Sequence, residues 1–511
     1  MRTITIGKLV SLMLAVLSSQ AFAQSAQLDS SLSVLAAKYQ LVGMSVAVVK
    51  DSHIVFNGGY GLRDISRNLP VNQHTKFRIA SISKLLTAMA IMQLYEQGLF
   101  RLEHDVSQYI GFQLNNPAFA DQPITFKMLL SHTSSLRDGS GYDRFLSDSY
   151  AKNPPPILSQ LLVPGGSYYT SDMFDARYGP NQAYFQYANI NYGILGTLVE
   201  RISGERFDQY CRKHVFDPLE LAASFNVRDL PDINDLAVLY RKSGSSWVPQ
   251  FDQYNGIYPA ERDLSGYTIG ANGIIFSPQG GLRISAYDLA KLMIVHLQGG
   301  SYQKVRLLAD TTIQRMHDIV WRYNGSNGNS YFGIFKTYAL GNHTTSDLLP
   351  GQQLIGHPGE AYGLISDFYF SKAGNYGIIF ITNGGVWSYG RYSGWYNVEE
   401  DVFQTCFAQL PNLTSIHPAT AVTILGFQLD QNYPNPFNSA TRIRFHLPSA
   451  SGVSLAVFDM TGRRVVQLVD RYVPSGVHEV ILDGSQLPSG IYFYQMRAGQ
   501  FSAARKLILL R

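Results

Sequence analysis

The amino-acid sequence predicts an α+β domain with a sheet and a helical subdomain, followed by a small β-sandwich domain. Segments with helical spacing stand at both ends of the first 410 residues, β-rich segments lie inside them, and a long helical insertion separates the strands. Beyond residue 428 the pattern changes to short alternating runs separated by turns. A chain of 511 residues exceeds the usual size of one domain, so at least two hydrophobic cores are expected.

The first domain, residues 24–410, begins and ends with predicted helices. The predicted elements, in chain order, are a helix over 27–40, a strand over 44–50 with a hairpin partner over 54–60, a helix over 81–98, short helices and long loops from about 105 to 265, strands over 353–371 and 376–382 joined by a turn at 372–374, and a helix over 398–409. This order favours a sheet domain with a helical subdomain. A substrate site is expected in the crevice between the two parts.

Residues 411–428 are predicted as a linker and residues 429–511 as the β-sandwich domain. The predicted strands of this second domain are 441–447, 453–459, 464–469, 478–482, 491–497 and 504–510. Turn signals with glycine separate them, and several short strands at this spacing predict a sandwich of about seven strands.

The N-terminal segment, residues 1–23, is predicted to be an export signal peptide. Arg2 and Lys8 precede an apolar run over residues 9–17, and a small-x-small cleavage site ends at Ala23. The apolar run is too short for a mature membrane-spanning helix, although an N-terminal membrane anchor is the alternative interpretation. No other segment approaches the length of a transmembrane helix, so we expect no stable membrane span and an exported, soluble protein.

Charge and cysteine content argue against two classes of function. The 41 Lys and Arg residues nearly balance the 37 Asp and Glu residues, and no dense basic stripe is present, so we expect no nucleic-acid partner. Cys211 and Cys406 are the two cysteines, and neither has a metal-type neighbour. Both lie in helical-looking segments, which favours buried apolar side chains over a disulfide.

Ser81 and Lys84 form the first candidate catalytic pair. A serine hydroxyl is a poor nucleophile unless a base removes its proton, and a lysine can be that base when its pKa is lowered. A separation of three residues brings both side chains to one face of the predicted helix that they open. Free N–H groups at a helix start also favour developing negative charge. The alternative is an N-cap serine beside a solvent-exposed lysine.

Two other serines precede a lysine at the same spacing. Ser149 and Lys152 run into three consecutive prolines at residues 154–156, which exclude a helix. Ser301 and Lys304 lie in a predicted loop after two glycines. Ser81 alone combines the spacing with a long predicted helix and an apolar approach.

Two later segments add polar side chains of the same chemistry. Tyr187 and Asn189 precede a predicted helix, and in an extended loop the two side chains project to the same side, where they can enter a cleft together. A buried tyrosine with a turn-capping asparagine is the alternative. Residues 356–359, Gly-His-Pro-Gly, stand at a predicted edge strand, because Pro358 cannot donate to a β-ladder. His357 taken alone is equally compatible with a structural role.

Taken in this order, the three segments resemble the motifs Ser-x-x-Lys, Tyr-x-Asn and Lys- or His-x-Gly of the serine β-lactamase and penicillin-binding-protein family. The supporting stretches that are also similar are 59–61 (GYG), 129–136 (LLSHTSSL), 191–196 (NYGILG) and 280–282 (GGL). The resemblance covers roughly residues 30–409. It implies a β-lactamase-like fold with an antiparallel sheet flanked by helices, a serine hydrolase activity, and no metal or nucleotide cofactor.

The resemblance also implies roles for the site residues. Ser81 is expected to attack a carbonyl carbon and form an acyl-enzyme. Lys84 and Tyr187 are expected to share the general acid and base work, and Asn189 to position Lys84 and the substrate. His357 is expected in the wall that holds the acyl or carboxylate side of the substrate.

The implied oxyanion hole consists of the backbone N–H groups of Ser81 and of Glu360, the residue after Gly359. Two features depart from the commonest pattern of the family. His357 replaces a lysine, so a permanent positive charge is missing there at neutral pH, and Glu360 replaces a small residue. Both features argue against efficient β-lactam hydrolysis.

Three functions therefore stay open. The first is a secreted serine hydrolase that cleaves an ester or amide, with a small ester, amide or D-amino-acid peptide as substrate. The second is a D-Ala-D-Ala carboxypeptidase or β-lactamase, and the third is a catalytically silent binding or sensor protein. The aromatic stretch over residues 387–395 is a candidate wall of a substrate pocket, or alternatively a surface loop.

The C-terminal domain resembles the sorting domain of type IX secretion substrates. The similarity rests on residues 429–438 (LDQNYPNPFN), on 490–494 (GIYFY) and on the basic, apolar end at 505–511. It implies the secretion machinery as a partner and delivery through the periplasm to the cell surface or medium. A carbohydrate-binding or adhesive β-module is the alternative.

Overall fold

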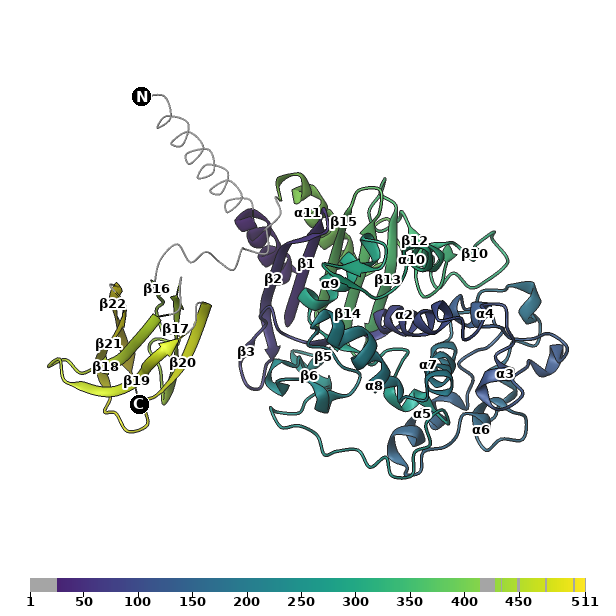
Figure 1. Ribbon diagram of the computed structural model, residues 1–511. Coiled ribbons are helices and arrows are strands. Elements are labelled where there is room, and N and C mark those ends of the chain that lie inside the picture. Colours follow the sequence, from purple (N-terminus) through teal and green to yellow (C-terminus); the bar gives the residue numbers. More distant parts are fainter. Residues whose placement is uncertain are drawn as a thin grey trace. The chain divides into compact units, whose positions relative to one another are not determined.

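The structure of the protein is a computed structural model that describes residues 25–413, 428–432, 434–447, 451–473, 476–499 and 501–510 (Figure 1). The chain forms two compact units that divide between residues 415 and 416. The signal peptide expected at residues 1–23 lies outside the described residues, as does most of the linker expected at residues 411–428. These domain bounds therefore stay predictions.

The first unit is built on a seven-stranded antiparallel sheet with the strand order β12-β13-β14-β15-β1-β2-β3. The strands are β1 (Gly43–Lys50), β2 (His53–Asp64), β3 (Leu69–Pro70), β12 (His343–Thr345), β13 (Leu354–Ala361), β14 (Leu364–Ser371) and β15 (Tyr376–Thr382). Strands from the two ends of the unit are thus paired at the centre of one sheet, through β1 and β15.

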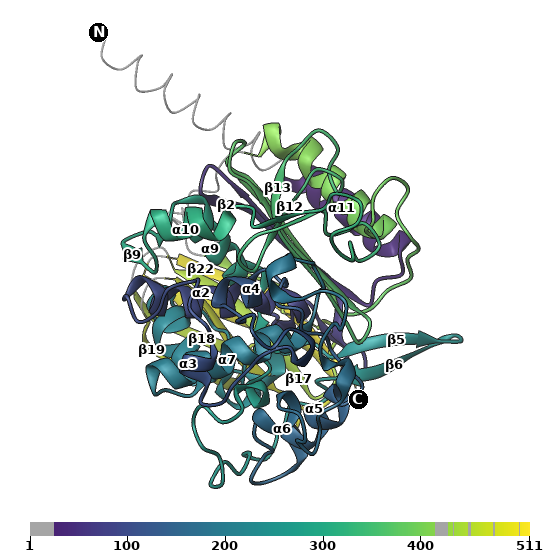
Figure 2. The same cartoon turned by 90° about the vertical axis from the view of Figure 1, so that its right-hand side faces the viewer.

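Helices cover both faces of this sheet, which explains why its central strands β1, β14 and β15 are buried along nearly their whole length. Successive residues of β1 enter different cores: Ala47 packs with α2 and α9, whereas Val46 and Val48 pack with α11 and the N-terminal helix over residues 25–38. Figure 2 shows α9 and α11 on opposite sides of the sheet. Alternation of side chains along a strand produces this division.

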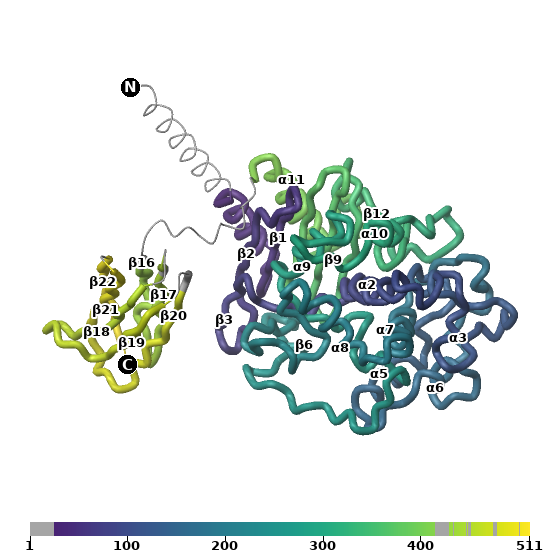
Figure 3. The backbone as a smooth tube through the Cα atoms, viewed as in Figure 1, coloured from purple at the N-terminus to yellow at the C-terminus, as the bar shows by residue number. Residues whose placement is uncertain are grey.

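The helical part of the unit is inserted between β3 and β12, and Figure 3 follows the chain through it. The helices of the unit are α2 (Ser83–Glu96), α3 (Ser107–Ile110), α4 (Phe126–Leu130), α5 (Tyr142–Ala151), α6 (Ser159–Leu162), α7 (Asn189–Ser203), α8 (Phe207–Cys211), α9 (Ala286–Leu297), α10 (Asp310–His317) and α11 (Asn397–Gln409). The short strands of the unit are β4 (Phe77–Arg78), β5 (Leu239–Ser243), β6 (Ser246–Phe251), β7 (Arg283–Ile284), β8 (Ser301–Tyr302), β9 (Val305–Arg306), β10 (Trp321–Arg322) and β11 (Thr337–Tyr338).

The helix that we expected over residues 81–98 begins later than its sequence suggests. A 3₁₀ turn, η1 (Ala80–Ile82), precedes α2, so Ser81 lies in the turn and Lys84 in the first turn of the α-helix. Ala80 has a φ of 45°, in the left-handed region that a side chain with a Cβ rarely adopts. The chain turns sharply there between β4 and α2, and the turn holds Ser81 partly exposed above a buried helix.

The second unit is a β-sandwich of two antiparallel sheets. One sheet has the order β16-β17-β20 and the other the order β19-β18-β21-β22. The strands are β16 (Gln428–Leu429), β17 (Ala440–Leu447), β18 (Ser451–Phe458), β19 (Arg464–Val473), β20 (Gly476–Asp483), β21 (Gly490–Ala498) and β22 (Phe501–Leu509). Alternate side chains of both sheets, including Ile443, Leu455 and Tyr494, form the shared core. The predicted fold class is confirmed.

The second unit is expected to be dispensable for the fold of the first. A chain ending at Ser415 keeps Leu410 and Leu413, which are buried in the first unit and whose carbonyls accept hydrogen bonds from Lys50 Nζ at 2.8 Å. We expect it to unfold at the temperature of the full-length first unit and to keep its activity, as measured by circular dichroism and ester hydrolysis.

A chain ending at Gln409 is the matched control. It loses two buried leucines, each contributing about 1.5–3 kcal/mol, and should unfold at a clearly lower temperature. An inactive or unfolded protein ending at Ser415 would show that the second unit completes the first.

Candidate active site

Ser81 and Lys84 lie together at the start of α2. Lys84 Nζ is 3.0 Å from Ser81 Oγ, and the lysine side chain is fully buried. Ser81 stays partly exposed and lines a cleft. The spacing that the sequence shows thus becomes a direct contact between a hydroxyl and an amine.

Three oxygen atoms surround the Lys84 amine. Besides Ser81 Oγ, Lys84 Nζ donates to Asn189 Oδ1 at 2.9 Å and to the Gln279 carbonyl at 2.8 Å. Burial lowers the pKa of Lys84 to about 7, and the charge of Asp138 partly opposes this shift. Near neutral pH a large share of the amine is therefore uncharged, with its lone pair free to accept a proton from Ser81.

Tyr187 and Asn189 enter the same site from the start of α7. Ala188 between them is extended, and Asn189 is the first residue of the helix. Burial raises the pKa of the Tyr187 phenol above its ordinary value, and a hydrogen bond with Ser81 works in the opposite direction. Lys84 Nζ lies 4.9 Å from the centre of the Tyr187 ring. The hydroxyl of Ser81 is therefore flanked by an amine and a protonated phenol.

Asp138 is a site residue that the sequence alone did not single out. Its carboxylate accepts hydrogen bonds at 2.9 Å from the backbone N–H groups of Asn189 and Ile190 and from Asn189 Nδ2. The carboxylate thus caps the N-terminus of α7. Because it holds the amide nitrogen of Asn189, the amide oxygen is directed toward Lys84. Asp138 and Asn189 are 51 positions apart, so the sequence has no local spacing from which to infer this contact.

His132 supports the loop that carries Tyr187 and Asn189. Its Nδ1 accepts a hydrogen bond from the backbone N–H of Ala188 at 3.2 Å and lies 3.0 Å from Asn191 Nδ2. The imidazole is buried, and burial lowers its pKa well below the ordinary value. These contacts give His132 a structural role.

His357 lies in β13, fully buried beside the site. Its Nδ1 is 2.6 Å from the Pro358 carbonyl, which can only accept, so Nδ1 carries the proton. Its Nε2 therefore accepts the hydrogen bond from the Tyr338 hydroxyl at 2.9 Å. Burial and the nearby Lys84 lower the pKa of His357 well below its ordinary value. The imidazole is neutral, and both of its nitrogens already have partners within the protein.

Gly359 brings β13 against the turn that holds Ser81. A Cβ at residue 359 would lie 2.5 Å from the Ile79 carbonyl and 2.3 Å from Ser366 Oγ, so only glycine allows this approach. The pairing of β12 with β13 ends at Gly356, which leaves residues 357–361 as the strand edge beside Ser81. Glu360 is exposed on this edge, and its carboxylate accepts a hydrogen bond from the Tyr396 hydroxyl at 3.2 Å.

Two cavities meet at Ser81. The larger is a cleft of about 890 Å³ lined both by the helical part, through residues such as Tyr142, and by the sheet, through Glu360. The smaller has a volume of about 150 Å³ and lies on the side of His357. Ser81, Tyr187 and Glu360 line both cavities.

The other candidates from the sequence lie outside this arrangement. Ser149 Oγ accepts a hydrogen bond from Asn272 Nδ2, whereas Lys152 forms an ion pair with Asp148. Ser301 lies in the short strand β8. Two lysines share the Lys-x-Gly spacing of the third motif but lie away from Ser81: Lys242 is in the hairpin strand β5 and Lys372 is in the turn after β14. Cys211 and Cys406 are buried and free.

Within the described parts of the chain, no group of three or more His, Cys, Asp or Glu side chains is arranged to hold a metal ion. The same residues include no helix with the length and apolar character needed to cross a membrane.

Comparison with known proteins finds two matching regions. Residues 27–401 match the family described as Beta-lactamase, and residues 431–510 match the Secretion system C-terminal sorting domain. Protein flp of Staphylococcus aureus (strain MW2) is 26% identical over 224 residues, which are 43% of this chain and 41% of that protein. The chain thus spans about two fifths of the length of this relative.

Solved structures share the fold at low sequence identity. The octameric penicillin-binding protein homologue from Pyrococcus abyssi aligns with a TM-score of 0.55 and 19% identity, over 94% of this chain and 99% of that one. The D-amino acid amidase from Ochrobactrum anthropi SV3 aligns with a TM-score of 0.53 and 18% identity, over 76% of this chain and 99% of the other.

Proposed function

Because the chain belongs to the β-lactamase family, which it matches over residues 27–401, we propose that it is a secreted serine hydrolase acting through an acyl-enzyme on Ser81. The observation that carries the proposal is the buried Lys84 amine, which lies 3.0 Å from Ser81 Oγ and whose pKa is lowered to about 7. A buried lysine of this kind is costly for the fold and serves as a base at neutral pH. The bond cleaved is an ester or amide.

In the proposed first step, Ser81 Oγ attacks the substrate carbonyl while Lys84 accepts the hydroxyl proton. Tyr187 keeps its proton at neutral pH because burial raises its pKa, so it is suited to protonate the leaving group. Lys84 then passes the proton taken from Ser81 to the Tyr187 phenolate, so the amine is again uncharged and the phenol again protonated. In the second step water attacks the carbonyl carbon of the acyl-enzyme. Tyr187 and Lys84 accept the proton that the water loses and return a proton to Ser81 Oγ as the acyl group leaves.

The developing oxyanion is assigned to the backbone N–H groups of Ser81 and Glu360. The close approach of β13 at Gly359 supports this assignment, because it places the strand edge beside η1. One such donor typically contributes a factor of about 10²–10³ in rate. Asn189, held by Asp138, is assigned the positioning of Lys84 and of the substrate.

A second candidate function is a carboxypeptidase or β-lactamase that acts on a carboxylate-bearing substrate. Arg78 favours it: the guanidinium lies 4.4 Å from the centre of the Phe251 ring and 5.2 Å from that of Tyr362, in the large cleft with Ser81. Its Nε donates to the Gly280 carbonyl, and among the described residues no carboxylate forms an ion pair with it. On the β13 side, however, His357 is neutral and Glu360 adds negative charge.

The two candidates differ in the substrate that is turned over fastest. At pH 8, where Lys84 is mostly uncharged, we expect kcat/KM for p-nitrophenyl butyrate to exceed that for nitrocefin and for diacetyl-Lys-D-Ala-D-Ala. The reason is that β13 offers no permanent cation for a carboxylate.

The variant Arg78→Gln tests the second candidate function. If the carboxylate-bearing substrates are faster and Arg78→Gln selectively removes their advantage, the carboxypeptidase or β-lactamase function replaces the first proposal. If none of the three substrates is turned over or acylates Ser81, the protein is a silent binding module.

For the C-terminal unit we propose delivery by the type IX secretion machinery. The match of residues 431–510 to a secretion-system sorting domain supports it. The predicted signal peptide would bring the chain to the periplasm first, and the sorting domain would then direct it to the cell surface or medium.

A further inference from the structure

The smaller cavity beside Ser81 has an unusual lining. Of its sixteen lining residues, seven are Tyr, Phe or Trp, two are Glu, and none is Lys or Arg. His357 also lines it but is neutral. Its volume of about 150 Å³ is that of a cavity able to hold a benzene-sized group. The cavity is therefore aromatic and acidic, and it opens directly at the nucleophile.

One wall of the cavity is held in a strained backbone conformation. Tyr331 and Phe332 have φ values of 50° and 58°, which are rare for bulky residues. Phe332 is 82% exposed, so burial of its ring does not compensate for this conformation. Strained residues that persist in this way are concentrated at ligand sites. The strain points to a ligand that contacts these rings.

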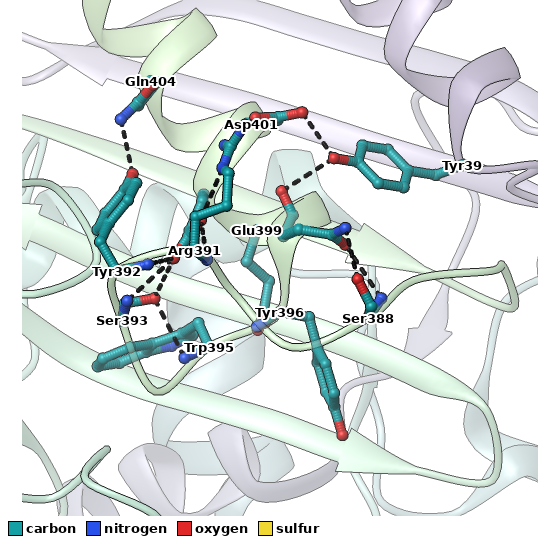
Figure 4. Close-up of polar contacts among 12 residues, drawn as sticks. Tyr39, Ser388, Arg391, Tyr392, Ser393, Trp395, Tyr396, Glu399, Asp401 and Gln404 are labelled. Atoms are coloured by element: carbon teal, nitrogen blue, oxygen red, sulfur yellow. Dashed lines mark hydrogen bonds and ion pairs between the residues drawn. The ribbon is translucent and has the colours of Figure 1, made fainter.

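A second part of the lining comes from the aromatic loop over residues 388–396, whose polar contacts are drawn in Figure 4. The Glu400 carboxylate fixes this loop. This carboxylate accepts hydrogen bonds from the backbone N–H groups of Arg391, Tyr392 and Ser393 at 2.8–3.1 Å and from Ser393 Oγ at 2.7 Å. The guanidinium of Arg391 pairs with Glu400 and Asp401.

Figure 4 shows Arg391 directed toward Asp401 and the Tyr396 ring directed away from this network. The one basic residue of the loop is thus engaged on the far side, while Tyr389 and Tyr396 line the cavity. Tyr389 is 76% exposed at its rim. The loop therefore contributes aromatic rings to the cavity, whereas the guanidinium of Arg391 is not part of the lining.

Two acids, Glu360 and Glu399, line the cavity, and a third, Asp367, lies next to Glu399. Glu360 is exposed and bound by the Tyr396 hydroxyl, and Glu399 is buried and accepts the Tyr396 backbone N–H at 2.6 Å. Asp367 is buried next to Glu399, and burial raises the pKa of both carboxyls. Among the described residues, none of these three acids forms an ion pair with Lys or Arg. Burial favours the protonated form of Asp367 and Glu399, so the exposed Glu360 is the acid whose carboxylate an incoming cation would meet.

We propose that this cavity binds an organic ammonium group of the substrate, through cation–π contacts with its aromatic rings and the negative charge of Glu360. Aromatic side chains gathered around a cavity recognise such groups, including quaternary ammonium ions. The inference rests on the proposed function only in that it assigns the bound cation to the substrate of Ser81. The substrate is then an ester or amide that carries a positive charge near the scissile bond.

The test compares the binding of two ligands of equal shape to the full chain carrying Ser81→Ala. Choline has a trimethylammonium group where 3,3-dimethylbutan-1-ol has an uncharged tert-butyl group. By isothermal titration calorimetry we expect choline to bind at least about tenfold more tightly, the ratio that ~1.4 kcal/mol of cation–π stabilisation gives.

Added to that chain, Glu360→Gln and Tyr396→Leu should each reduce the preference for choline severalfold. Glu103→Gln, at an exposed glutamate outside both cavities, should leave it unchanged. Thermal unfolding checks that each variant is folded. Equal affinities, no binding of choline, or a preference that survives both cavity variants would overturn the cation site.

Hydrolysis of p-nitrophenyl butyrate by the unmodified chain reports on the proposed function separately. Choline binding without any hydrolysis would refute the serine hydrolase and leave the cation site standing. Hydrolysis without a preference for choline would do the reverse.

Discussion

The change Ser81→Ala is expected to lower kcat/KM for p-nitrophenyl butyrate by about 10⁴- to 10⁶-fold. The Ser81 hydroxyl belongs to the only side chain in the proposed mechanism that bonds to the substrate carbon, so no other side chain replaces it. The fold should persist, because Lys84 keeps its contacts with Asn189 and Gln279 and the lost hydrogen bond is worth about 1 kcal/mol. Steady-state kinetics and thermal unfolding measure the two effects.

The matched control is Ser301→Ala, which removes a serine with the same lysine spacing from the short strand β8. It should leave kcat/KM within about twofold of the unmodified chain. A Ser81→Ala protein that retains most of its activity would refute the assignment of the nucleophile.

Removal of the proton-transfer pair is expected to have the second largest effect. Lys84→Ala and Tyr187→Phe should each lower kcat/KM by about 10²–10⁴-fold, the range for general acid–base catalysis. The double variant should lose less than the product of the two single losses, because residues that act as one unit are not additive. The physical basis is their shared contact with Ser81.

Lys304→Ala, at the lysine that pairs in sequence with Ser301, is the control for the loss of a positive charge. It should change neither the rate nor its pH dependence. In the unmodified chain, kcat/KM should rise as the pH increases through about 7, because Lys84 acts as a base only after it loses its proton. If the losses of the two single variants multiply in the double variant, Lys84 and Tyr187 do not cooperate as proposed.

The parts of the fold that could be predicted from sequence are those with local patterns. The hairpin of β1 and β2 follows from a short β-rich run, whereas the helix α11 and the strands of the sandwich follow apolar periodicity of 3.6 or two residues. The start of α2 was placed too early, because nothing local distinguishes a 3₁₀ turn at residues 80–82 from the first turn of an α-helix.

The candidate site was predictable only where a short motif carried it. Ser81 and Lys84 stand three residues apart, whereas Asp138 and the Gln279 carbonyl reach the site through tertiary contacts across 51 and 195 residues. From the sequence, the loop over residues 387–395 is compatible both with a pocket wall and with a surface loop. The Glu400 carboxylate holds this loop in place as part of the cavity wall. These hydrogen bonds depend on the register of α11 against the loop, which no local sequence pattern reveals.

The central claim is that Ser81 is a nucleophile activated by a buried lysine. Intact-mass analysis after incubation with a fluorophosphonate probe, followed by peptide mapping, tests it most directly. We predict a single adduct on Ser81, formed faster at pH 8 than at pH 6 and absent from Ser81→Ala. An adduct on Ser149 or Ser301, or labelling of Ser81→Ala to the same extent as the unmodified chain, would contradict the claim.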